Sequence, residues 1–127
     1  MHDRFIRSPQ DIFEQFHERL RYLQHEEFWV VFLNSKNKVI GEERISVGSL
    51  NLAVVHPREV FKSAIRRSAN AIIAVHNHPS GSTDSSYEDR QLTSRLQESG
   101  NVMGIELLDH VIIADSSYHS FKEHGEM

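Results

Sequence analysis

The chain has 127 residues, 39% hydrophobic and 25% charged, which suits one globular domain spanning residues 1–127. Its net charge of −4 argues against direct nucleic-acid binding, which requires clustered positive charge. The lack of cysteine excludes disulfides and thiol catalysis, and with no bilayer-length apolar run and no signal peptide we expect a cytoplasmic protein without a membrane partner.

The N-terminal third predicts a helix followed by a β-hairpin. Ser8 and Pro9 are typical of a helix start, and apolar residues at helical spacing continue the helix to about Gln24. The apolar run at residues 28–33 predicts a strand buried on both faces. A turn then leads into a second strand at residues 39–47.

A second helix is predicted to begin at Pro57, after a loop at 48–51 and a short extended segment at 52–55. Its core-facing residues are expected to be Val60, Phe61, Ala64 and Ile65, and its solvated residues Arg58, Lys62, Arg66 and Arg67.

The remaining elements complete an α+β or mixed three-layer domain. A strand is predicted at residues 69–76, and a helix at 86–98 is expected to end with Gly100 as its C-terminal cap. Residues 105–114 and 118–121 then read as a closing hairpin. The order helix, strand, strand, helix, strand, helix, strand, strand is typical of an α+β fold.

The most informative motif lies at the end of the strand at 69–76. His76 and His78 share one side of the strand because side chains alternate, and Asp89 follows a turn at the start of a helix. Two imidazoles and one carboxylate are a catalytic type of zinc set, which leaves a fourth position for water. Taken singly, the histidines suit an ordinary strand-to-loop turn, and Ser86 with Asp89 suits a helix-capping box. The joint pattern favours a metal site.

His76-x-His78, seven residues, Ser86, two residues and Asp89 together resemble the signature of the JAB/MPN (JAMM) metalloprotease superfamily. The string from His78 to Gly81 resembles its RadC-like branch, and the resemblance covers residues 8–124. It implies a JAB/MPN-like (cytidine-deaminase-like) α+β fold, a curved mixed sheet flanked by helices. The stretches 55–61, 107–113 and 120–123 also match.

The chain departs from the RadC-like pattern at one position in this motif. Ser85 stands where the pattern usually has proline. Proline would preset the first helical turn, so its replacement is expected to loosen the loop without removing a ligand.

The resemblance implies a zinc-dependent hydrolase of amide or isopeptide bonds, whose substrate is a peptide or a protein conjugate. His76, His78 and Asp89 would bind one Zn²⁺ ion. A glutamate before the first strand would act as general base, and the RadC-like spacing selects Glu26 over its neighbour Glu27. Ser86 would help to hold the oxyanion.

Two other functions remain open. RadC-like proteins carry a DNA-repair label, so the chain is alternatively a non-catalytic DNA-repair accessory or protein-interaction module that keeps the fold. Two histidines and one carboxylate also describe an Fe(II) oxygenase site, although the order of the ligands favours zinc. Longer RadC-like members have an N-terminal helical DNA-binding region, so this chain is a stand-alone form or the C-terminal domain of a longer protein.

Three further histidines are assigned no metal. His110 is interpreted as a hydrogen-bonded buried residue of a strand, outside the metal site. His119 and His124 lie near a C-terminus that we expect to be mobile.

Overall fold

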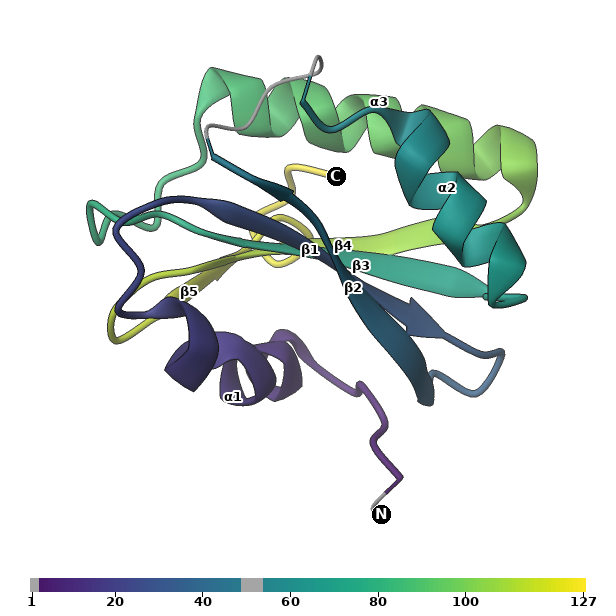
Figure 1. The fold of residues 1–127 in the computed structure, drawn as a ribbon, viewed down its shortest axis with the longest axis horizontal. Helices are drawn as coiled ribbons and strands as arrows, with labels where there is room; N and C mark the ends of the chain where they lie inside the picture. The colour runs from purple at the N-terminus through teal and green to yellow at the C-terminus, as the bar shows by residue number, and fades with distance from the viewer. Residues whose placement is uncertain (1–2, 49–53) are drawn as a thin grey trace.

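The computed structural model describes residues 3–48 and 54–127, which form a five-stranded mixed sheet covered by helices on both faces (Figure 1). The strand order is β2-β1-β3-β4-β5; β3 and β4 are parallel, and the other neighbouring pairs are antiparallel. This confirms the predicted α+β class. The elements are α1 (Pro9–Leu20), β1 (Glu27–Leu33), β2 (Val39–Val47), α2 (Pro57–Arg66), β3 (Ala71–Asn77), α3 (Tyr87–Met103), β4 (Glu106–Ile113) and β5 (Tyr118–Ser120).

Each face of the sheet has its own apolar core. The α1 side chains of Ile12, Phe16 and Leu20 are buried against one face, while α2 and α3 cover the other (Figure 1). Because residues alternate along β3, Ile72 and Ala74 face α2 and α3. His76 follows in the same alternation, so the fold directs it toward α3. None of the described helices is long and apolar enough to cross a membrane.

The first helix ends four residues earlier than predicted. Its last helical residue is Leu20, and Arg21 and Tyr22 form a turn. The apolar periodicity was misleading because Leu23 still packs against the core from that turn, whose Leu23 N–H donates to the Leu20 carbonyl at 3.3 Å. The residues between Leu20 and Glu27 therefore connect α1 to the first strand of the sheet.

The predicted end of α3 at Gly100 is wrong, because the helix continues to Met103. Gly104, with φ of 73°, supplies the left-handed cap instead. Gly100 serves close packing: a Cβ there would overlap the carbonyl oxygen of Ile105 and lie 3.5 Å from the Phe61 ring. The absent side chain lets α3 approach the chain that leads into β4.

We expect Gly100→Ala to lower the free energy of unfolding by about 1–3 kcal/mol, the usual effect of overpacking a core. The sign of this change distinguishes overpacking from helix propensity, because alanine in a helix otherwise stabilises by roughly 0.5–1 kcal/mol relative to glycine. Urea unfolding measures the change, and Ser94→Ala at an exposed position of α3 is the control. A more stable Gly100→Ala variant would show that the helix has room for the methyl group.

Two expectations for the segment around α2 need correction. Ile65 is 52% exposed and does not face the core, whereas Val60, Phe61 and Ala64 do. Of the extended segment predicted at 52–55, residues 52 and 53 lie outside the described part of the chain. Residues 54 and 55 form a turn and a bend that lead into the helix.

The C-terminus is packed against the domain, contrary to the expectation of mobility. Phe121 is fully buried, and the backbone N–H of Glu126 donates to its carbonyl at 2.9 Å. The Glu126 carboxylate contacts His119 and accepts a hydrogen bond from the Ser85 hydroxyl at 2.8 Å. Ser85 thus ties this loop to the C-terminal segment through a hydroxyl that proline lacks.

Candidate metal centre

Two imidazoles meet at the C-terminal end of β3. The Nε2 atoms of His76 and His78 are 3.1 Å apart, as expected for alternate residues that leave the chain on one side. His76 is fully buried, and His78 is partly exposed just beyond the strand. The Nδ1 of His78 lies 3.0 Å from the carbonyl oxygen of Ser82, so this nitrogen donates and Nε2 is the nitrogen that would bind a metal.

The carboxylate of Asp89 reaches both imidazoles from the first turn of α3. Its Oδ1 is 3.2 Å from Nε2 of His76, and its Oδ2 is 3.0 Å from Nε2 of His78. Burial opposes ionisation, but the two imidazoles beside the carboxylate outweigh it and hold the pKa of Asp89 well below its usual range. In His78, burial alone would lower the pKa, but the hydrogen bond with Asp89 raises it. The site therefore favours a positive charge.

Asp89 is fixed by the backbone that begins α3. The Ser86 hydroxyl accepts the N–H of Asp89 at 3.0 Å, while Oδ2 of Asp89 accepts the N–H of Ser86 at 2.9 Å. The capping box that the sequence suggested for Ser86 and Asp89 is thus present. It directs the carboxylate toward the histidines. Capping leaves the hydroxyl proton of Ser86 available to another acceptor, so its predicted role at an oxyanion stays a prediction.

Glu26 approaches the same imidazoles from the segment before β1. Ligand atoms of Glu26, His76 and His78 all lie within 4.8 Å of one another. Adjacent Glu27 points elsewhere: its buried carboxylate accepts hydrogen bonds from Trp29 Nε1 at 3.0 Å and from Arg44 at 3.4 Å. The structure therefore places Glu26, and not Glu27, beside the histidines.

The donor set suits a divalent cation. The Nε2 lone pairs of His76 and His78 and the anionic oxygens of Asp89 converge within about one coordination sphere. A bound cation would offset the negative charge of Asp89 among these groups. The predicted ligands His76, His78 and Asp89 are thus brought together, with Glu26 beside them, and these residues can hold a metal ion.

Asn77, which the sequence analysis did not assign, holds the segment that carries Glu26. Its Oδ1 accepts the backbone N–H of Glu27 at 2.8 Å, and its Nδ2 donates to the carbonyl of His25 at 3.0 Å. Both bonds flank Glu26, whose own carbonyl accepts the N–H of Gly48 at 2.8 Å. The residue between the two histidines thus fixes the glutamate beside them.

Asn77→Ala is expected to lower the free energy of unfolding by about 1–3 kcal/mol, because it leaves the Glu27 N–H buried without a partner. Metal content should stay at the wild-type level, since Asn77 contacts neither imidazole nitrogen. Urea unfolding and metal analysis measure the two quantities. Asn77→Asp is the matched variant: it can still accept from Glu27 but cannot donate to His25. An Asn77→Ala variant as stable as the wild type would contradict the role of Asn77 in holding the segment that carries Glu26.

His110 does not stand apart from the site, as the sequence interpretation held. It is fully buried and hydrogen-bonded, as expected, but its Nε2 lies 2.7 Å from Nδ1 of His76. Its other ring nitrogen lies 2.6 Å from the hydroxyl of Thr93 on α3. The stretch that contains His110 matches the RadC-like pattern but does not indicate this role. Thr93 has no such signal, because the contacts depend on how β3, β4 and α3 pack together.

Comparison with known proteins identifies the fold family. A family model described as the RadC-like JAB domain matches residues 6–126. A UPF0758 protein of Staphylococcus carnosus is 60% identical over 120 residues, covering 94% of this chain and 53% of the relative. UPF0758 proteins of Caldanaerobacter subterraneus and Desulfitobacterium hafniense are 57% and 58% identical over 120 residues, covering 94% of this chain and 52% and 53% of their own lengths. The chain therefore spans about half the length of these relatives.

Proposed function

This chain belongs to the RadC-like JAB domain family, and on that premise we propose that it is a zinc-dependent hydrolase of amide or isopeptide bonds. One observation carries the proposal: Glu26 lies beside the imidazoles of His76 and His78, which also contact the carboxylate of Asp89. Two neutral ligands, one anionic ligand and a separate carboxylate are the groups that metal-assisted hydrolysis requires. The substrate class proposed is a peptide or a protein conjugate.

When bound, zinc would polarise the scissile carbonyl and lower the pKa of a coordinated water to about 7. The chain supplies the remaining steps. Glu26 accepts a proton from the attacking water and delivers it to the leaving nitrogen. The hydroxyl of Ser86 donates to the oxygen that gains negative charge. His76, His78 and Asp89 would hold the metal.

The experiment combines metal analysis with a substrate screen. Purified protein is stripped with a chelator and reloaded with Zn²⁺ or Fe²⁺. Each form is then tested on peptides and on isopeptide-linked protein conjugates. We expect one zinc per chain and hydrolysis by the zinc form only. Activity of the iron form that requires oxygen would support an oxygenase site instead, and a zinc-loaded protein inert on every conjugate would contradict the hydrolase proposal.

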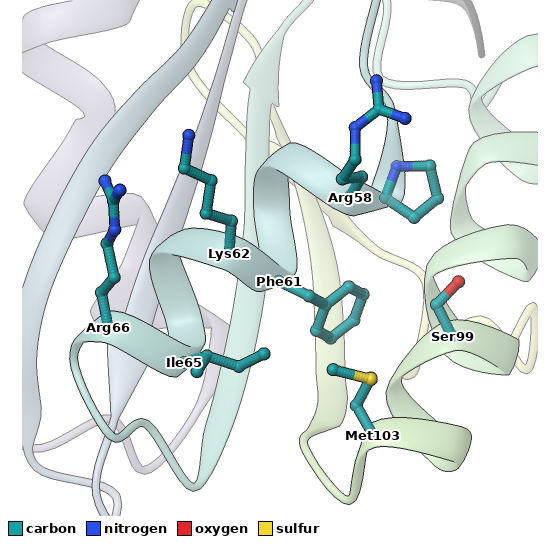
Figure 2. A pocket seen from close by; sticks show the side chains of 8 residues that line it. Arg58, Phe61, Lys62, Ile65, Arg66, Ser99 and Met103 are labelled. Atoms are coloured by element: carbon teal, nitrogen blue, oxygen red, sulfur yellow. The ribbon is translucent and has the colours of Figure 1, made fainter.

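A second function, binding of a protein partner, is favoured by a groove away from these residues. The groove, about 540 Å³ in volume, lies between α2 and α3. Figure 2 shows Phe61, Ile65 and Met103 directed between the two helices, while cationic side chains extend from α2. These exposed cations form no ion pair with the residues that the structure describes; they are Arg58, Lys62 and Arg66.

Apolar lining beside these cations suits an acidic peptide with apolar side chains. An NMR titration with such a peptide should shift the Ile65 and Met103 signals, and a lysine-substituted version of the peptide should not. No shift with either peptide would contradict partner binding at this groove. Direct nucleic-acid binding is not proposed, because the net charge is −4.

A further inference from the structure

A series of three hydrogen bonds leads from Nδ1 of His76, the ring nitrogen that faces away from the site, into α3. Nδ1 of His76 lies 2.7 Å from Nε2 of His110, and Nδ1 of His110 lies 2.6 Å from the Thr93 hydroxyl. That hydroxyl lies 2.8 Å from the carbonyl oxygen of Asp89. His76 and His110 are fully buried, and Thr93 is nearly so. The series thus starts at one candidate ligand and ends on the backbone of another.

The backbone carbonyl of Asp89, the last group of the three hydrogen bonds, fixes the direction of each of them. A carbonyl oxygen can only accept, so the single hydroxyl proton of Thr93 points to Asp89. The Thr93 oxygen must then accept, and the proton between it and His110 belongs to Nδ1 of His110. A neutral imidazole with Nδ1–H has a lone pair on Nε2. His110 therefore accepts the Nδ1–H of His76, whose Nε2 keeps its lone pair toward the site.

The surroundings of His110 keep it neutral. Its ring is fully buried, stacks on Phe121 with 4.6 Å between ring centroids, and meets the edge of Phe28 at 5.9 Å. Among the residues that the structure describes, the hydrogen-bond partners of its ring nitrogens are the Thr93 hydroxyl and the His76 imidazole.

We propose that Thr93 and His110 are positioning residues that hold His76 in the Nδ1–H tautomer, with the Nε2 lone pair aimed at the metal. The proposal rests on the proposed function only in taking His76 as a ligand. A ligating histidine usually donates its second nitrogen to a carboxylate, a carbonyl or a water, each of which fixes the tautomer directly. Here the partner is a second histidine, which itself has two tautomers, so Thr93 is needed to choose between them.

Thr93 and His110 oppose the effect of the neighbouring Asp89 carboxylate on the tautomer of His76. Oδ1 of Asp89 lies 3.2 Å from Nε2 of His76, and an anionic oxygen there favours a proton on Nε2, which would block metal binding. The two histidine ligands therefore differ. His78 is set by the Ser82 carbonyl at 3.0 Å, which accepts in every case, whereas His76 depends on Thr93 through His110.

Thr93→Val tests the proposal because valine matches threonine in shape but neither accepts nor donates. Without an acceptor for its Nδ1–H, His110 can move its proton to Nε2 and donate it to Nδ1 of His76. Long-range ¹H–¹⁵N spectra of the metal-free protein report each tautomer, at a pH about two units above the ordinary imidazole pKa of ~6.5. We expect Nδ1–H for His76 in the wild type and Nε2–H in Thr93→Val.

The controls separate the tautomer from general damage. Thr93→Ser restores the hydroxyl and should restore the wild-type signal of His76. The His78 signal should stay at Nδ1–H in all variants, because Ser82 is unchanged. Should Thr93→Val fail to fold, Thr93→Ala makes the same deletion with less bulk. An Nε2–H signal for His76 in the wild type, or an unchanged signal in the folded valine or alanine variant, would overturn the proposal.

Metal affinity is the second measurement. Competition with a chromophoric zinc chelator should show a roughly 10–100-fold weaker zinc affinity in Thr93→Val, the usual effect of removing a partner of a ligand, and near-wild-type affinity in Thr93→Ser. Both readouts are independent of any substrate. A protein that binds zinc without hydrolysing conjugates would refute the hydrolase and leave this inference standing. Equal zinc affinity in the threonine and valine forms would refute this inference alone.

Discussion

Glu26→Gln is expected to abolish hydrolysis while metal content and folding stay unchanged. The carboxamide is nearly isosteric with the carboxylate but cannot accept a proton from the attacking water. Loss of a general base lowers kcat by roughly 10²–10⁴-fold. The measurement is the rate of conjugate cleavage by zinc-loaded protein, with zinc content determined on the same sample.

Glu27→Gln is the matched control one residue away. Burial opposes ionisation of Glu27, but hydrogen bonds with Trp29 and His25 and the charge of Arg44 outweigh it, so that the pKa of Glu27 lies below the ordinary value. The glutamine variant should therefore lose some stability and keep activity. Activity that survives Glu26→Gln and disappears in Glu27→Gln would move the base by one residue. Activity unaffected by both changes would remove the general base from the mechanism.

Asp89→Asn should lose the metal although α3 still begins at Ser86. The asparagine oxygen can accept the N–H of Ser86, as Oδ2 does now, so the capping box is retained. The change removes the anionic ligand and leaves two neutral imidazoles. We expect zinc affinity to fall by more than the roughly 10–100-fold that loss of a ligand's supporting partner costs. Chelator competition gives the dissociation constant.

Two further variants separate the two tasks of Asp89. Asp89→Ala removes ligand and cap together, and it should also lower the free energy of unfolding by about 0.5–2 kcal/mol, the usual cost of a lost cap. Ser86→Ala removes the other half of the box and should cost similar stability while zinc stays bound. Wild-type zinc affinity in Asp89→Asn would remove Asp89 from the ligand set.

The ligand pattern is readable from the sequence because it is local. His76 and His78 share a side through strand alternation alone. Ser86 and Asp89 meet through the geometry of a helix start, whatever the rest of the fold does. The order of helices and strands indicated the fold class in the same way, whereas the ends of α1 and α3 were predicted at the wrong residues. At Gly100 the sequence shows a glycine but not the packing against Ile105 that requires it.

What surrounds the ligands was decided by the tertiary structure. The bond between Asn77 and Glu27 spans 50 residues and exists because β1 pairs antiparallel with β3, placing Phe28 opposite His76. His76 and His110 are 34 residues apart and meet because β4 lies parallel to β3.

The RadC-like spacing selected Glu26 over Glu27, but the place of Glu26 beside the histidines likewise depends on how the start of β1 meets the end of β3. Local sequence fixes which side chains share a face of one element, because backbone geometry repeats. Only packing between elements fixes which faces meet, since that depends on the register and layers of the whole sheet.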